Sequence, residues 1–178
     1  MLVGSQQVPI EGEHMPIALT SMEQLLPFPT AEELTTKKTE GLVSVTPGTT
    51  VLTALGLMAE KHIGFLPVIE NGALLGVLSE RDCARRVVLR QLAAGTTTVR
   101  EIMSTHVYSV PGQTRIHECV MLMHDRNIRH LPVMRGKEVI GVLSVRDLMG
   151  ALIERHERLL RRFHEERLTL LYPDPSSY

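Results

Sequence analysis

The stretch Gly76-Val77-Leu78-Ser79-Glu80-Arg81-Asp82 returns 65 residues later as Gly141-Val142-Leu143-Ser144-Val145-Arg146-Asp147. Six of the seven positions are identical in the two copies. In each copy an apolar strand leads into a serine, and an aspartate follows three residues after that serine. This spacing is typical of a helix start, where the hydroxyl accepts from free backbone N–H groups and a carboxylate suits the positive helix end.

The pattern has two interpretations. In the first, it is a repeated capping box that only starts two helices. In the second, it belongs to a binding site for a ribose phosphate, because an aspartate accepts hydrogen bonds from sugar hydroxyls while the serine and the free N–H groups face phosphate. The residues alone leave both interpretations open.

The repeat extends beyond this stretch. Ile63 and the run Leu66-Pro67-Val68 match Ile128 and the run Leu131-Pro132-Val133 at the same spacing. Four apolar positions of one expected helix also match four of another: Val51, Ala54, Leu55 and Met58 correspond to Ile116, Cys119, Val120 and Met123. Two such copies do not form a solenoid, so they predict two halves related by a pseudo-twofold axis, with two equivalent clefts between them.

The composition is that of an ordinary soluble globular protein. The 178 residues are 43% hydrophobic and 22% charged. A net charge of −1 without a basic stripe argues against nucleic acid as the main partner. No apolar run approaches about 18 residues and no secretory leader opens the chain, so we expect a cytoplasmic protein without a membrane partner. Cys83 and Cys119 stand at apolar-periodic positions and are expected to be buried thiols.

The first half of the chain is expected to contain an arm and one repeat. Residues 1–35 form an arm that is partly irregular, with a short helix near Ser21–Leu26. The first repeat covers residues 36–95, and its expected elements are a strand at Leu42–Val45, a helix from Thr49 or Thr50 to about Lys61 that Gly64 ends, strands Phe65–Ile69 and Leu74–Leu78 around an Asn71-Gly72 turn, and a helix Glu80–Leu92.

The second repeat, residues 96–153, follows the same order. Its expected elements are a lead-in at Thr97–Met103, a strand Val107–Val110, a helix Thr114–Arg126, strands His130–Met134 and Val139–Leu143 around Arg135-Gly136, and a helix from Val145 past Arg167. The sequence therefore predicts an α/β fold of two β-α-β-β-α repeats, with helices on one face of the sheet and a long C-terminal helix.

Residues 154–178 form a helical extension and tail. A 3-4 spacing runs through Met149, Leu152, His156, Leu159, Phe163, Glu166 and Leu170. Because two of these seven positions are polar, the coiled-coil signal is weak. The helix can pack on its own repeat or extend into a dimer partner.

These residues resemble a tandem pair of CBS domains, the Bateman module named after cystathionine β-synthase. The resemblance covers about residues 36–153 and rests on the two Leu-Pro-Val runs and the two Gly-Val-Leu-Ser-x-Arg-Asp stretches in register. The chain is most similar to small stand-alone bacterial members. The resemblance implies a regulatory, signal-transduction module that binds AMP, ADP, ATP or NAD, and less readily S-adenosylmethionine, and that forms a homodimer and acts on an unidentified protein partner.

The resemblance also implies which residues line each cleft, since the family builds a cleft from one repeat's lead-in and Leu-Pro-Val strand and the other repeat's Ser-x-x-Asp. One cleft would hold Thr98, Val99, Ile102, Met103, Arg129, His130 and Pro132 with Ser79, Arg81 and Asp82. The other would hold Lys38, Thr39, Gly41, Gly64, Phe65 and Pro67 with Ser144, Arg146 and Asp147.

The side-chain chemistry agrees with this assignment. Arg81 and Arg146 lie near helix starts, where they could reinforce phosphate binding. Arg129 and His130 add donors to the first cleft alone, so in the second cleft Lys38 must supply the charge. Each arginine could instead be a solvated surface residue, and His130 could be a packed or exposed histidine without a ligand role.

Other functions find less support. His117 and His124 share a helix face, but no carboxylate or cysteine completes a metal site with them. No Gly-rich phosphate loop, nucleophile elbow or HExxH motif occurs, so we expect neither catalysis nor a catalytic cofactor. The remaining alternative to a ligand sensor is a structural dimerisation module with vestigial ligand sites.

Overall fold

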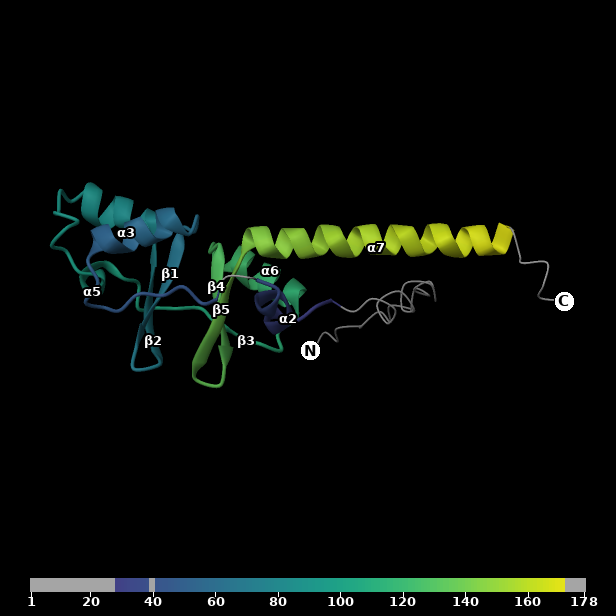
Figure 1. The fold of residues 1–178 in the computed structure, drawn as a ribbon, viewed down its shortest axis with the longest axis horizontal. Coiled ribbons are helices and arrows are strands. Elements are labelled where there is room, and N and C mark those ends of the chain that lie inside the picture. Colours follow the sequence, from purple (N-terminus) through teal and green to yellow (C-terminus); the bar gives the residue numbers. More distant parts are fainter. Residues whose placement is uncertain (1–27, 39–40, 172–178) are drawn as a thin grey trace, which may run out of the picture.

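The computed structural model describes residues 28–38 and 41–171, and Figure 1 shows their arrangement. The helix expected near Ser21–Leu26 lies outside the described residues. The α/β class is confirmed: two β-hairpins stand side by side, and helices pack against each of them. Strands β1 (Phe65–Glu70) and β2 (Ala73–Ser79) form a two-stranded sheet, while β3 (Val110–Pro111), β4 (His130–Arg135) and β5 (Glu138–Ser144) form a three-stranded sheet in that order.

The first repeat has the expected order of elements. Helix α3 spans Val51–Glu60, and strands β1 and β2 span Phe65–Glu70 and Ala73–Ser79. The turn between the strands has positive φ at both Asn71 and Gly72, 52° and 79°. A two-residue turn of this kind matches the natural twist of a hairpin, which explains why the Asn-Gly pair predicted the turn correctly.

The second repeat copies the first. Helix α6 spans Ile116–Asp125, and the antiparallel strands β4 and β5 span His130–Arg135 and Glu138–Ser144. The short strand β3, Val110–Pro111, pairs with β4 in parallel. Helix α7, Val145–Leu171, then leaves the body of the molecule as the predicted long C-terminal helix.

Three expected elements differ in the structure. Helix α3 is ended by His62 and not by Gly64: His62 has φ 53°, and the N–H of Ile63 returns to the carbonyl of Met58 at 2.9 Å, as in a Schellman motif. The strand expected at Leu42–Val45 is reduced to one bridge between Val45 and Val68. The strand expected at Val107–Val110 begins only at Val110.

The helix expected over Glu80–Leu92 is also shorter and changes type. Helix α4 covers only Glu80–Cys83, and a π-helical turn, η1, follows at Ala84–Val88. A π turn widens the helix and shifts which residues face inward. Arg86 lies in this turn, and its guanidinium donates to the carbonyls of Ile102 and Met103 in the lead-in of the second repeat.

Two short lead-in helices are exchanged between the repeats. Helix α2, Ala31–Thr36, precedes the first repeat, but its Ala31 and Leu34 belong to the core of the second. Helix α5, Val99–Ile102, lies in the lead-in of the second repeat, but Val99 and Ile102 belong to the core of the first. Helix α2 was not predicted. It starts with a capping box between Thr30 and Glu33, and Figure 1 places it beside β5 and β3.

The remaining surface carries scattered apolar side chains. Met149 and Ile153 on α7 are about half exposed, at 50% and 55%, and so are Leu160 and Phe163 further along the helix. In the part of the chain that the structure describes, no helix is both long and apolar enough to cross a bilayer.

Candidate functional site

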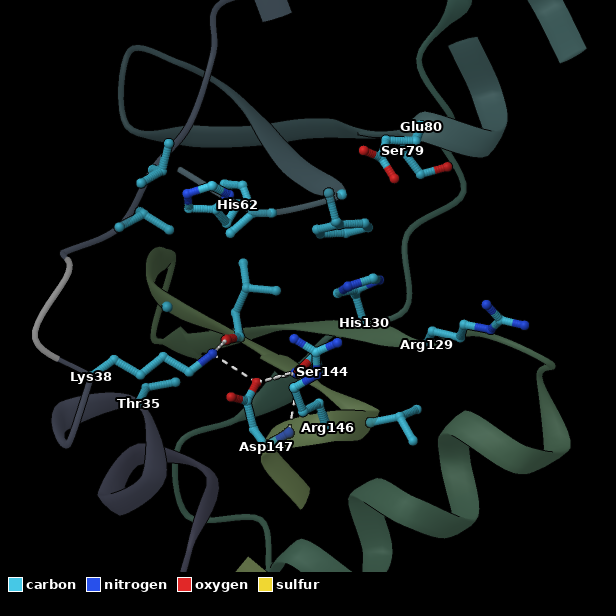
Figure 2. Close-up of a pocket in the computed structure, with 18 of the residues that line it drawn as sticks. Thr35, Lys38, His62, Ser79, Glu80, Arg129, His130, Ser144, Arg146 and Asp147 are labelled. Carbon is cyan, nitrogen blue, oxygen red and sulfur yellow. Dashed lines mark hydrogen bonds and ion pairs between the residues drawn. The ribbon is translucent and has the colours of Figure 1, made fainter. Parts of the chain in front are cut away.

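A cavity of about 660 Å³ lies between the two repeats. The strand-to-helix junctions of both repeats contribute to it, β2 to α4 on one side and β5 to α7 on the other. Figure 2 shows Ser79 and Glu80 on one wall and Lys38, Ser144 and Asp147 on the opposite wall. The cavity is therefore built around the two copies of the stretch that defines the repeat.

Both copies of that stretch form capping boxes in this structure. The hydroxyl of Ser79 accepts from the N–H of Asp82 at 3.2 Å, and the carboxylate of Asp82 accepts from the N–H of Ser79 at 3.0 Å. Ser144 and Asp147 repeat this exchange, at 3.2 Å and 2.6 Å. The capping role that the sequence suggested is thus present, and it places both aspartates at helix starts without excluding a second role in binding.

Asp147 also forms an ion pair. The ammonium of Lys38, which follows helix α2, lies 2.7 Å from Oδ2 of Asp147 and donates to the carbonyl of Val142 at 2.8 Å. Burial alone would raise the pKa of Asp147, but hydrogen bonds from Lys38 and Ser144 outweigh burial and hold the pKa below its usual range. Asp147 is therefore an anion in the neutral pH range, and Lys38 reaches it from the exchanged lead-in (Figure 2).

Two rings stack at the boundary between the repeats. Phe65 and His130 occupy equivalent positions, opposite Ser79 and Ser144 in their hairpins. Their ring centroids are 4.7 Å apart with an angle of 12° between the planes. Burial lowers the pKa of His130, Asp147 raises it, and the cations Lys38, Arg129 and Arg81 lower it further, so the net shift is downward and the imidazole is neutral at pH 7.

The charged residues of the cavity are mainly basic. Four cationic side chains line it, and two carboxylates oppose them, namely Lys38, Arg81, Arg129 and Arg146 against Glu80 and Asp147. Apolar side chains supply another part of the wall: Leu42, Val43, Ile63 and Ile140. An apolar surface next to an excess of positive charge suits a ligand that has an aromatic ring and an anionic group.

The structure brings together residues that the sequence had assigned to separate clefts. Most residues predicted for the cleft at Ser144 and Asp147 line this cavity. Some of those predicted for the cleft at Ser79 and Asp82 line it as well. The lining residues from the two predicted sets are Lys38, Gly41, Gly64, Phe65, Ser144, Arg146 and Asp147, joined by Ser79, Arg81, Arg129 and His130. Their role in binding stays a prediction.

Other predicted residues lie outside this cavity. Pro67 and Pro132 are buried in strands β1 and β4, and Val99 and Ile102 are in the core of the first repeat. Thr98 caps α5 and Met103 ends it, while Asp82 faces Arg86. Thr39 lies outside the described residues.

Sequence reasoning missed several residues of the site. The apolar wall was not predicted, although Leu42 and Val43 follow the predicted Gly41 and Ile63 precedes the predicted Gly64. Arg86, which lies outside the cavity, was also not predicted. Its guanidinium donates to the carbonyls of Ile102 and Met103 at 2.7 and 3.0 Å, and its Nε lies 3.8 Å from Oδ1 of Asp82.

Comparison with known proteins identifies a family. The family model described as "CBS domain" matches residues 31–89 and 99–154. The first match begins at Ala31, where helix α2 starts, and thus includes the exchanged lead-in.

Relatives and solved structures agree with that match. The CBS domain-containing protein YhcV of Bacillus subtilis is 34% identical over 62% of this chain and 78% of its own length. The mitochondrial CBS domain-containing protein CBSX3 of Arabidopsis thaliana is 32% identical over 65% of this chain, which spans only 58% of that protein. A structure of a protein with CBS domains from Burkholderia ambifaria matches with a TM-score of 0.67 at 37% identity, covering 70% of this chain and 94% of that one.

One further structure was solved with a ligand. The CBS domain protein PAE2072 from Pyrobaculum aerophilum, complexed with AMP, matches with a TM-score of 0.62 at 25% identity. The match covers 72% of this chain and 98% of that one.

Proposed function

Because the chain belongs to the CBS-domain family, with two copies of the domain, we propose that it is a regulatory module and not an enzyme. In this proposal it binds an adenosine-containing ligand, AMP or NAD first among them, in the cavity between its repeats. Binding would bias the arrangement of the repeats only if the ligand binds two conformations with different affinities. The observation that carries the proposal is the anionic Asp147 next to a cationic, partly apolar cavity.

The cavity offers a partner for each part of such a ligand. The apolar side chains of Val43, Ile63 and Ile140 suit a flat base. Asp147 can accept from the ribose hydroxyls, and the start of α7 with Ser144 and Arg146 can receive a phosphate. AMP bound to the Pyrobaculum protein supports this class of ligand.

A panel of ligands tests the proposal. We expect AMP, ADP, ATP and NAD to raise the melting temperature and to give heat in calorimetry, with S-adenosylmethionine weaker, because its sulfonium centre meets the cationic side chains. Guanosine and cytidine monophosphates are controls for phosphate binding alone. If millimolar adenine nucleotides gave neither a melting shift nor heat, the structural alternative would hold, in which the capping boxes are the whole purpose of the Ser-x-x-Asp stretches.

The titration of His130 provides a first prediction. In the free protein its imidazole should titrate below the usual pKa, about 6.5 for histidine, because burial and neighbouring cations disfavour the charged form. A bound phosphate adds negative charge and should raise that pKa. Binding then takes up a proton, so affinity should increase as the pH falls from about 8 to 6.

Proton resonances of the histidine rings with and without AMP measure this change, and His130→Gln identifies the signal. Because the phosphate of AMP also titrates in this range, the pH dependence of affinity should be compared between the wild type and His130→Gln. The contribution of His130 to the pH dependence of AMP affinity should be absent in the variant. A pKa that stays the same or falls on adding AMP would place the phosphate away from this side of the cavity.

A homodimer is the second prediction. Exposed apolar side chains on the helices of both repeats, Leu52, Met121, Met149 and Ile153, offer a surface for a second copy. We expect light scattering to give the mass of a dimer at micromolar concentration, and Met149→Glu to give a monomer, because a buried unpaired carboxylate opposes association. Lys137→Glu, at the exposed tip of hairpin β4-β5, is the control and should remain a dimer. A monomeric wild type, with and without nucleotide, would refute the prediction.

A further inference from the structure

The two Ser-x-x-Asp clefts are not equivalent in this chain, and Arg86 marks the difference. Arg86 follows Asp82 by four residues, and the equivalent position after Asp147 is Ala151, which is 8% exposed in the core. We propose that the Arg86 guanidinium closes the cleft at Asp82, so that the chain binds one adenosine-containing ligand, at Asp147. This inference rests on the proposed function and narrows the two clefts expected from the sequence to one.

Arg86 occupies the space between Asp82 and the lead-in of the second repeat. One terminal nitrogen donates to the carbonyls of Ile102 and Met103, and the other donates to the hydroxyl of Ser104 at 3.1 Å. Its Nε faces Oδ1 of Asp82, while Oδ2 of Asp82 accepts from Ser79. These contacts engage both carboxylate oxygens and the end of helix α5, which are the groups that this cleft would present to a nucleoside.

The position of Arg86 on its helix allows this contact. Arg86 lies in the middle of η1, Ala84–Val88, directly after the single turn of α4. The neighbouring Arg85 is exposed. Arg86 follows Asp82 by four residues, a spacing that places two side chains on one helix face, and the two side chains are in contact.

The backbone of the lead-in segment also pairs with the neighbouring strand. The lead-in is joined to strand β2 by two hydrogen bonds of 2.9 Å, between the N–H and carbonyl groups of Ser104 and Val77. The equivalent carbonyl of β5, on Val142, accepts from the side chain of Lys38 at 2.8 Å. A lysine side chain can move aside for a ligand at modest cost, whereas the guanidinium of Arg86 is held by hydrogen bonds to Ile102, Met103 and Ser104.

The position of the cavity agrees with this difference. Its wall includes Ser144 and Asp147 from the second repeat but only Ser79, Glu80 and Arg81 from the equivalent stretch of the first. Asp82, Arg86 and the lead-in residues 98–103, all of which the structure describes, are not part of that wall. Of the two aspartates, Asp147 is the one that lines this cavity.

Calorimetry with AMP tests the inference through stoichiometry. We expect one ligand per wild-type chain and two per chain in Arg86→Ala, which copies the alanine of the second repeat. Adding Asp82→Ala to Arg86→Ala should restore one, because the newly opened cleft then lacks its ribose acceptor. Arg85→Ala is the matched control, an adjacent exposed arginine, and should bind one. Circular dichroism checks that each variant is folded.

Each result decides a separate point. Two ligands on the wild-type chain would overturn the inference and leave the proposed function standing. No ligand on the wild-type chain would overturn both. A single ligand on a folded Arg86→Ala chain would show that Arg86 is not the residue that closes the cleft. The wild-type stoichiometry remains decisive even where Arg86→Ala does not fold.

Discussion

Asp147→Ala is expected to weaken AMP binding by about tenfold to a hundredfold. The variant removes the carboxylate that would accept from the ribose hydroxyls, and the loss of a charge-assisted hydrogen bond typically costs roughly 1.5–3 kcal/mol. Stability should fall less. The ion pair with Lys38 is partly exposed, at 37% and 26% for the two side chains, and such pairs contribute about 0.2–1 kcal/mol.

Calorimetry and thermal melting on the same samples separate these two effects. Glu118→Ala is the matched control, because Glu118 is also a first-turn carboxylate in a capping box, on the N–H of Arg115, and it is remote from the cavity. We expect Glu118→Ala to lower the melting temperature slightly and to leave AMP affinity unchanged. If Asp147→Ala lowered the melting temperature while AMP affinity stayed at the wild-type value, Asp147 would be a helix-start residue and nothing more.

Local chemistry explains what could be predicted from the sequence. The Asn71-Gly72 turn requires positive φ at two adjacent residues, and the Ser-x-x-Asp spacing satisfies the free N–H groups of a helix start. Both signals depend only on residues within four positions of each other. Because the Ser-x-x-Asp stretch occurs twice at a fixed spacing, the sequence also predicts the repeated order of elements.

Non-local packing explains what could not be predicted. Helix α2 has six residues, too few to show a helical period, and it is buried against the second repeat, far along the chain. The π turn at η1 also has no sequence signal. In a continuous α-helix Arg85 and Arg86, three and four residues after Asp82, would both lie near it, so the sequence does not distinguish between them.

The candidate site was likewise predicted only in part. Ser144, Arg146 and Asp147 were named from the motif, and all three line the cavity. Phe65 and His130 were assigned to separate clefts because they belong to separate repeats, yet their rings stack on each other. The sequence establishes that the two positions are equivalent, but it does not show that the pseudo-twofold relation brings them into contact.

Gly141→Ala is expected to destabilise the protein by about 1–3 kcal/mol and to weaken AMP binding at the same time. A Cβ at this position would lie 2.7 Å from Cγ2 and 2.9 Å from Cβ of Thr35, closer than atoms can pack. Thr35 cannot turn away freely, because it is buried and its hydroxyl donates to the carbonyls of Ala31 and Glu32 at 3.1 and 2.9 Å. Helix α2 must therefore shift from β5.

That shift would carry Lys38 with it, since the N–H of Lys38 donates to the carbonyl of Thr35 at 3.2 Å. The wall of the cavity that contains Lys38 and Thr35 would move away from Asp147. Denaturant unfolding measures the loss of stability, and calorimetry with AMP measures the loss of affinity. Both should change together, because one displaced helix causes both.

Gly56→Ala is the matched control, and we expect it to change stability in the opposite direction. Gly56 lies inside helix α3, and a Cβ there would meet no atom within 4 Å. Alanine is preferred to glycine in a helix by about 0.5–1 kcal/mol, so this variant should be more stable than the wild type and should bind AMP equally well. If Gly141→Ala were as stable as the wild type, helix α2 would not be held against β5 as closely as this structure shows, and Lys38 would not be fixed beside Asp147 through that contact.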